Sequence, residues 1–369
     1  DTFAWTIPSD IAVGNQYQIR VTVAAQQAVS QNFQIVNPAA NYYVNDAGTA
    51  GDVFTSAAGN NANSGKSPDA PMASLAALLL AYDIDPGDTI YVDAGTYQLT
   101  RNILITDQDG GLTITGPAGA VALLNRGNTG GSSYVIELQN ADDVTLEQLW
   151  LTGASVGIYA TPGSDSDRLT VRQMVVYGNS YRGILLHASN DQTTIQNSTF
   201  YGVPGGSGAD EQPYAIYLEG TDALVSGNTI TNSQYSGIEV YGARTIVSGN
   251  QLANNNSTGI YASFGGPVAD RIVVSGNTVH HGNVGIQAGG NGSFIGSVLV
   301  TGNEVYNNLA IGLYVVVGAE TVDNRVYDNT IGIFSQHSGL VRDNRVWHNA
   351  NIGIVMDQAT VRDNRVYAN

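Results

Sequence analysis

The end of the chain repeats one pattern three times, and this repeat limits the possible folds more than any other feature. It reads AIGLYVVVGAETVDNRVYDN, then TIGIFSQHSGLVRDNRVWHN, then ANIGIVMDQATVRDNRVYAN, so that Asn324, Asn344 and Asn364 fall 20 residues apart. A fixed period near 20 with alternating apolar residues is typical of a solenoid built from strands. One unit is too short to bury its own apolar face, so the units must stack on one another. Equivalent residues of successive turns then lie roughly 4.8 Å apart.

The same pattern extends upstream with looser spacing. Asparagines recur, mostly within S-G-N or T-G-N, at Asn197, Asn228, Asn250, Asn277 and Asn303. A small residue followed by an aliphatic one also recurs, from Gly157-Ile158 to Gly353-Ile354. We therefore predict an inward column of Ile and a column of buried Asn. Asn suits this place because it tolerates left-handed backbone and can hydrogen-bond the Asn of the next turn.

These residues resemble the right-handed parallel β-helix repeat of many extracellular polysaccharide-acting proteins, over about residues 83–369. The resemblance implies an all-β, single-stranded solenoid that is secreted or held at the cell surface. It does not choose a function, because one fold hosts many. The pattern stops at Asn369 in mid-repeat, so we expect further domains beyond it or self-assembly through this end.

Residues 41–82 are predicted to form an entry segment with a cap helix. NYYVND and GNNANSGKSPDAPMASLAALLLAYDIDPGDTIYVDAGTYQL resemble the entry to secreted β-helix lyases and glycosidases. Ser74 can cap a helix over 75–82 with one apolar face. We expect this helix to cover the N-terminal end of the coil, with the first strand at 89–92.

Residues 1–40 are predicted to be a small β-strand segment outside the coil. Two alternating runs, 16–24 and 32–36, joined by a polar turn, indicate a hairpin. The order W-x-I-P, G-x-x-Y-x-I-R-V and F-x-I resembles the last strands of immunoglobulin-like surface modules. The segment is therefore a partial β-sandwich or a simple strand appendage.

Charge narrows the classes of partner. The net charge is −17, from 31 acidic and 14 basic residues, and Lys66 is the only lysine. Such a surface repels nucleic acid and anionic membranes, and no apolar run is long enough to span a bilayer. A neutral polysaccharide suits this balance better than a polyanion. No cofactor is required by any motif, although the acidic loop at Asp165 and Asp167 leaves Ca²⁺ open.

The candidate site follows from strand alternation. If the Ile column points inward, the next residue on each strand points outward, as does the one two positions later. This places aromatic and charged residues on one face of neighbouring turns, beside a glycine-rich insertion that carries Asp210 and Glu211. The candidate catalytic residues are Glu219, Glu239, Asp210, Glu211 and His187. The candidate substrate-binding residues are Tyr159, Arg182, Tyr217, Tyr241 and Tyr261.

Three functions stay open for this face. Glu219 and Glu239, on neighbouring turns, could lie roughly 5–9 Å apart, the range used in glycoside hydrolysis, and their closeness would raise one pKa. A polysaccharide lyase or epimerase would use His187 as base and Tyr181 as acid near Arg182, but the D-P-H, N-T-D and G-H-G motifs of known families are absent. The third function is a non-catalytic structural or adhesive stalk, in which exposed Tyr and Glu merely decorate a β surface.

Overall fold

The computed structural model describes residues 14–23, 26–35, 40–202, 212–290, 297–337 and 339–369. The chain divides into two compact units, Asp1–Ala40 and Asn41–Asn369. No helix among these residues is long and apolar enough to cross a membrane.

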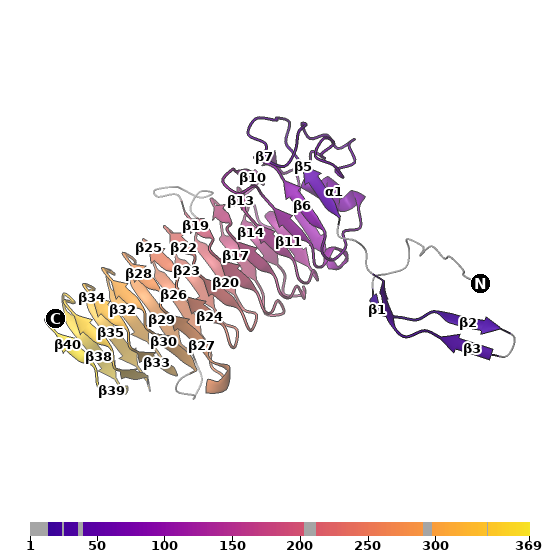
Figure 1. Cartoon of the computed structure of the whole chain (residues 1–369). Coiled ribbons are helices and arrows are strands. Elements are labelled where there is room, and N and C mark those ends of the chain that lie inside the picture. The colour runs from indigo at the N-terminus through magenta and orange to yellow at the C-terminus, as the bar shows by residue number, and fades with distance from the viewer. Residues whose placement is uncertain (1–13, 24–25, 36–39, 203–211, 291–296, 338) are drawn as a thin grey trace. The chain divides into compact units, whose positions relative to one another are not determined.

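The second unit is a coil of three parallel sheets, in which each turn adds one strand to each sheet (Figure 1). The 13-stranded sheet contains β5 (Asn41–Val44), β6 (Thr89–Val92), β9 (Thr113–Thr115), β12 (Thr145–Glu147), β15 (Thr170–Arg172), β18 (Thr194–Gln196), β21 (Leu224–Ser226), β24 (Ile246–Ser248), β27 (Ile272–Ser275), β30 (Val298–Thr301), β33 (Ala319–Val322), β36 (Leu340–Arg342) and β39 (Thr360–Arg362). The 12-stranded sheet contains β7 (Gly95–Gln98), β10 (Ala122–Asn125), β13 (Leu149–Thr152), β16 (Val175–Tyr177), β19 (Thr199–Tyr201), β22 (Thr229–Thr231), β25 (Gln251–Ala253), β28 (Thr278–His280), β31 (Glu304–Tyr306), β34 (Arg325–Tyr327), β37 (Arg345–Trp347) and β40 (Arg365–Tyr367).

The 11-stranded sheet carries the candidate site. It contains β8 (Ile103–Thr106), β11 (Tyr134–Gln139), β14 (Val156–Ala160), β17 (Arg182–Leu186), β20 (Tyr214–Leu218), β23 (Ser236–Val240), β26 (Thr258–Ser263), β29 (Val284–Gly289), β32 (Ile311–Val315), β35 (Ile331–Gln336) and β38 (Ile352–Asp357). In the described part of the chain, short 3-10 helices at Asp107–Asp109 and Val268–Asp270 interrupt the loops. The parallel β-helix predicted from the repeat is therefore confirmed.

The predicted inward column is present on the 11-stranded sheet. Ile158, Ile184, Ile216, Ile238 and Ile260 pair with one another in register, and each is fully buried. The small residue before each Ile has a steric cause. A Cβ on Gly259 would lie 2.3 Å from the Val279 side chain and 2.6 Å from the Gly285 carbonyl oxygen of the next turn. The close stacking of turns thus leaves no room for a side chain at Gly259.

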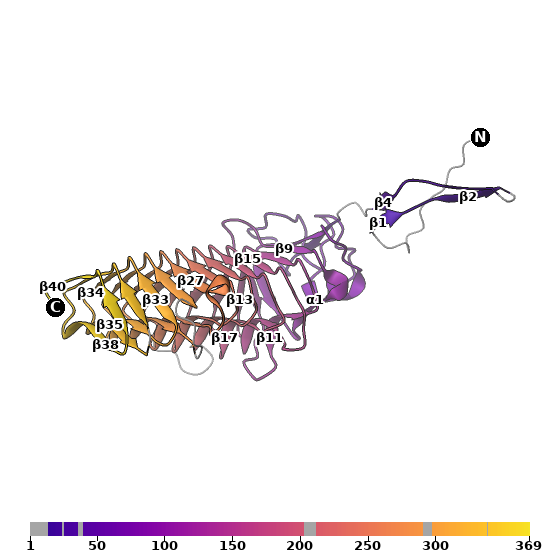
Figure 2. The same cartoon turned by 90° about the horizontal axis from the view of Figure 1, so that it is seen from below.

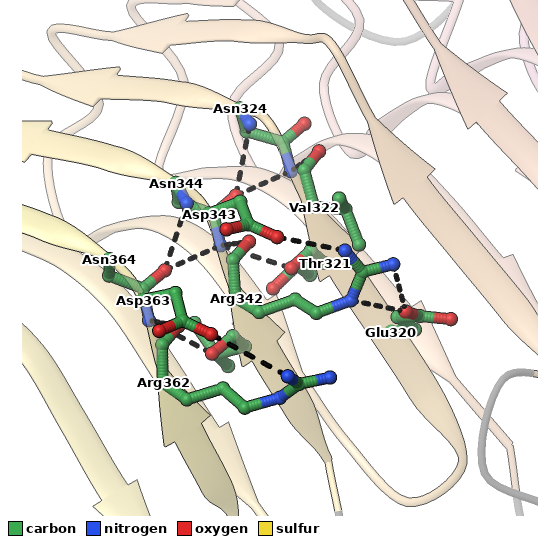
Figure 3. A network of polar contacts seen from close by, with 11 residues as sticks. Glu320, Thr321, Val322, Asn324, Arg342, Asp343, Asn344, Arg362, Asp363 and Asn364 are labelled. Atoms are coloured by element: carbon green, nitrogen blue, oxygen red, sulfur yellow. Dashed lines mark hydrogen bonds and ion pairs between the residues drawn. The ribbon is translucent and has the colours of Figure 1, made fainter.

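The predicted Asn column is confirmed from Asn228 onward. The backbone N–H and side-chain amide of each Asn donate to the side-chain oxygen of the Asn one turn later, at 2.9–3.0 Å. Figure 3 shows this chain of bonds through Asn324, Asn344 and Asn364, with Arg342 bound on the surface beside it. The assignment of Asn197 to this column was wrong. Ser198 donates to Asn228 instead, because Asn197 occupies the left-handed position that Gly227 takes one turn later.

The N-terminal end of the coil is covered as predicted. Helix α1 (Leu75–Ala81) begins after Ser74, whose hydroxyl accepts a hydrogen bond from the Ala77 N–H. Leu75 and Leu78 are buried, and α1 packs beside β8, the edge strand of the 11-stranded sheet. Figure 2 shows α1 at the N-terminal end of the coil. The first predicted strand, 89–92, is β6, and β5 from the entry segment extends its sheet by one strand.

The first unit contains two antiparallel pairs. β1 (Gly14–Tyr17) pairs with β4 (Phe33–Ile35), and β2 (Arg20–Val23) pairs with β3 (Gln26–Val29). The hairpin was predicted to turn between 24 and 32. Residues 26–29, which lie in the predicted turn, instead form strand β3 and pair with β2. The immunoglobulin-like resemblance stays a prediction.

Candidate functional site

The outward face of the 11-stranded sheet carries two adjacent columns of side chains. The first runs through Tyr159, Leu185, Tyr217, Glu239 and Tyr261, which pair strand to strand in register. The second contains His187, Glu219 and Tyr241, which directly follow β17, β20 and β23. The Glu219 and Tyr241 backbone N–H groups donate to Leu186 and Leu218 of the preceding turns, so the ladder continues through this second column.

Glu219 is the centre of a hydrogen-bonded cluster. Its Oε2 lies 2.9 Å from Nδ1 of His187, and its Oε1 accepts a 2.7 Å hydrogen bond from the Tyr217 hydroxyl. Burial opposes the charge on Glu219, but these hydrogen bonds outweigh it, so the pKa of the carboxyl lies below its ordinary value. Glu219 is therefore an anion at neutral pH, which suits a base or an orienting group and not a proton donor. The bond at Nδ1 leaves Nε2 of His187 as the nitrogen open to a ligand.

The tyrosines of the cluster stay protonated. Burial, together with the hydrogen bond to Glu219, raises the pKa of Tyr217. Burial and the charge of Glu239 raise the pKa of Tyr241, whose hydroxyl lies 3.5 Å from Glu239 Oε2. Burial beside Tyr134 raises the pKa of Tyr159 to about 12. Each hydroxyl therefore remains a hydrogen-bond donor at neutral pH.

A row of aromatic rings runs along the face across successive turns. Tyr159 stacks on Tyr134 at 4.0 Å between ring centroids and meets the His187 ring at 6.1 Å. The row continues from His187 to Tyr217 at 6.5 Å, and then to Tyr241 and Tyr261 at 5.2 and 5.7 Å. Beyond Tyr261 the face is hollowed by a cavity of about 380 Å³. This cavity is lined by Tyr241, Tyr261, Ser263, Phe264 and Gln287, among others.

The Arg182 guanidinium packs against three aromatic rings beside the cluster. Its guanidinium carbon is 4.1 Å from the ring centroid of Tyr181, 4.8 Å from Tyr214 and 4.3 Å from Tyr217. Its Nε is buried and makes no hydrogen bond to any residue that the structure describes. These contacts hold a positive charge against the ring of Tyr217 by cation–π attraction.

The two proposed carboxylates lie on the same face. Glu219 is on the turn of β20 and Glu239 is on the next turn, two positions earlier along the strand. A strand spacing of about 4.8 Å and a rise of about 3.3 Å per residue put their Cα atoms roughly 8 Å apart. Tyr181, the acid considered for a lyase, contacts Tyr214 and Arg182, and the tyrosines that meet His187 are Tyr159 and Tyr217. Asp210 and Glu211 lie outside the described residues.

Metal binding has no assembled site in the described part of the chain, where no three His, Asp or Glu side chains converge. Asp167 instead accepts a hydrogen bond from the Asp191 N–H and lies 3.8 Å from Arg168. The option of bound Ca²⁺ stays a prediction.

Comparison with known families agrees with this geometry. A model described as "Right handed beta helix region" matches residues 183–329 and 269–369, which together span 183–369, just over half of the 369 residues. The chain belongs to the right-handed β-helix family. Among curated proteins, none matches the sequence.

Solved β-helix structures share the fold at low sequence identity. The GH136 lacto-N-biosidase from Eubacterium ramulus has a TM-score of 0.53 and 11% identity, over 89% of this chain and 68% of that one. The A-module of the Azotobacter vinelandii mannuronan C-5 epimerase AlgE4 has a TM-score of 0.55 and 17% identity, over 76% and 86%. Pectate lyase Pel9A has a TM-score of 0.53 and 16% identity, over 88% and 80%. Identities this low show a common fold and leave the reaction open.

Two features of the structure were not predicted from the sequence. The hydrogen bond between His187 and Glu219 joins residues 32 positions apart, and only the strand register brings these two residues together. A second Asn column, Asn308, Asn329, Asn349 and Asn369, also stacks turn on turn. Its signal was present in the repeated ends YDN, WHN and YAN, each 20 residues after the last.

Proposed function

We propose that the protein binds a polysaccharide along the outward face of the 11-stranded sheet and hydrolyses it beside Glu219. The observation that supports binding is the row of rings from Tyr134 to Tyr261, with the carboxylates of Glu219 and Glu239 beside it on two of its turns. Aromatic rings offer flat apolar surface to sugar rings, and carboxylates and hydroxyls bind sugar hydroxyls. A ligand with many similar units matches a face built from repeated turns.

Hydrolysis assigns different roles to the two carboxylates. Glu219, held as an anion, accepts a proton from the attacking water, while that water forms a bond to the anomeric carbon. Glu239 donates a proton to the glycosidic oxygen as the carbon–oxygen bond breaks. Their Cα atoms lie roughly 8 Å apart on one face, which allows both carboxylates to reach one glycosidic bond.

A second candidate reaction is supported by the bond between His187 and Glu219. A carboxylate at Nδ1 orients the imidazole so that Nε2 can take a proton from a sugar carbon. Arg182 would neutralise a uronic acid carboxylate, and Tyr217 would protonate the leaving oxygen. This is the lyase or epimerase alternative, with Tyr217 in the place first considered for Tyr181. The net charge of −17 disfavours the polyanionic substrate that it needs.

Screening against a glycan panel, scored for binding and for new chain ends, tests these proposals. We expect Glu219→Gln and Glu239→Gln to lower the production of reducing ends by about 10²–10⁴-fold, the usual contribution of a general acid or base. Glu304→Gln is the matched control, because Glu304 accepts a 2.9 Å bond from Tyr327 on a different sheet. New unsaturated ends would instead favour elimination. Binding without new ends would favour a structural or adhesive stalk, and the lack of any binding would refute the proposal.

A further inference from the structure

A second and larger hollow lies at the N-terminal end of the same sheet face. Its volume is about 860 Å³, and it lies between α1 and the outward side chains of β8 and β11. One wall is apolar and is formed by Leu79 and Leu80 of α1 and by Leu104 of β8. Leu80 is 72% exposed and Leu104 is 39% exposed, so this apolar surface faces solvent. No residue assigned above to the central cluster lines this hollow.

A polar wall adjoins this apolar one, since Glu137 of β11 is the strand partner of Leu104 of β8. Asn102 organises it, since its amide donates to Glu137 Oε2 at 2.8 Å and its oxygen accepts from Arg126 Nε at 3.2 Å. Arg126 also donates to the Leu99 carbonyl at 3.3 Å. Neither Arg126 nor Arg101 makes an ion pair with any acid among the described residues. The wall therefore offers both guanidinium donors and carboxylate acceptors in positions set before a ligand arrives.

An apolar wall next to a wall of donors and acceptors suits a sugar ring. The carbon-bound hydrogens of the ring can cover leucines, while its hydroxyls bond to Arg126 and Glu137. The hollow is large enough for such a ligand, because pockets for small molecules occupy about 300–1,000 Å³. The mixed charge favours a neutral, hydroxyl-rich unit over an anion.

The cap helix closes the face at this end. β8 is the edge strand of the 11-stranded sheet, and α1 lies beside it, so a chain that follows the face meets α1 as a wall. Tyr134, which begins the aromatic row, belongs to β11, the strand that also supplies Glu137. The hollow is thus continuous with the row. It lies three to four strand spacings from Glu219, or roughly 14–19 Å.

We propose that this hollow binds the terminal sugar of a neutral glycan chain, so that the β-helix holds its ligand by the end. The inference rests on the proposed function, because the same chain would extend from the hollow over the row to Glu219. It adds the orientation of the glycan on the face and the length of the cleaved product. The chain would enter with one end against α1, and cleavage at Glu219 would release a short product of fixed length.

Hexasaccharide binding separates this inference from the central site. Xylohexaose, cellohexaose, laminarihexaose and mannohexaose are titrated calorimetrically into the full chain, along with the corresponding polymers. Leu80→Arg fills the hollow, and Arg126→Ala removes a donor. Leu309→Arg is the control, because Leu309 is 76% exposed on a distant turn. Tyr217→Ala combined with Tyr241→Ala removes rings from the central row.

We expect the two hollow variants to weaken hexasaccharide binding by at least about tenfold, since a hydrogen bond to a charged group contributes about 1.5–3 kcal/mol. They should also abolish the preference of the wild-type chain for hexasaccharide over an equal mass of polymer. Loss only in the hollow variants would support the hollow and overturn the central site. Loss only in the tyrosine variant would overturn the hollow. A wild-type chain that binds none of the four sugars would overturn both.

Discussion

Replacing Asn277 with Ala tests the stacking of the coil at one buried side chain. Asn277 is 1% exposed, and its oxygen accepts from the Asn250 N–H at 2.9 Å, while its amide donates to the Val247 carbonyl at 2.9 Å. Alanine leaves both of these backbone groups without that partner. A buried polar group that loses its hydrogen bond costs about 1–3 kcal/mol, so the two together predict a loss of about 2–6 kcal/mol.

Urea unfolding followed by circular dichroism measures this loss, and hydrogen exchange locates it. Repeat coils are stabilised by nearest-neighbour contacts, so we expect faster exchange mainly on the turns of β24 and β27. Asn256→Ala is the matched control, because Asn256 is exposed on the preceding turn. Equal unfolding midpoints for the two variants would refute the argument that the buried column stabilises the coil.

Three further outcomes follow from named contacts. Gly259→Ala should destabilise the coil by about 1–3 kcal/mol through overpacking against Gly285, whereas Gly131→Ala, with no neighbour within 4 Å of its Cβ, should leave the unfolding midpoint unchanged. Tyr217→Phe should raise the pKa of Glu219, measured by NMR titration of its carboxyl; an unchanged pKa would show that the hydroxyl does not bond there. The lowered pKa of Glu219 stabilises the fold above its ordinary value of 4.5 and loses this effect as the pH falls through the folded value. The melting temperature of wild type should therefore fall more steeply below pH 4.5 than that of Glu219→Gln, and parallel curves would contradict this.

The sequence predicted the coil well because each of its columns has a local cause. The period of 20 residues predicts the turns, the alternation of apolar residues predicts the strands, and the small residue before each Ile shows which side chains point inward. None of these signals requires knowledge of distant contacts. The same alternation placed Tyr217, Glu239 and Tyr261 on one outward face, in the register that the structure shows. It failed at Asn197, because a left-handed Asn and a buried Asn look alike in sequence.

The interactions within the site could not be predicted in this way. The bond between His187 and Glu219 depends on side-chain rotamers across two turns, and the lowered pKa of Glu219 depends on that bond. Sequence reasoning expected repulsion between carboxylates to set the acid and the base. At Glu219, burial raises the pKa, and the hydrogen bonds from Tyr217 and His187 together outweigh it. The hollow under α1 was also not foreseen, because it arises where a helix meets a sheet edge.

The most direct test of the account is a crystal structure of the Glu219→Gln variant with the tightest-binding glycan of the panel. The account predicts a glycan chain on the outward face of the 11-stranded sheet, with sugar rings against Tyr217 and Tyr241 and a glycosidic oxygen within hydrogen-bond distance of Glu239. A glycan bound to either of the other two sheets, or a bare face at saturating ligand, would contradict it.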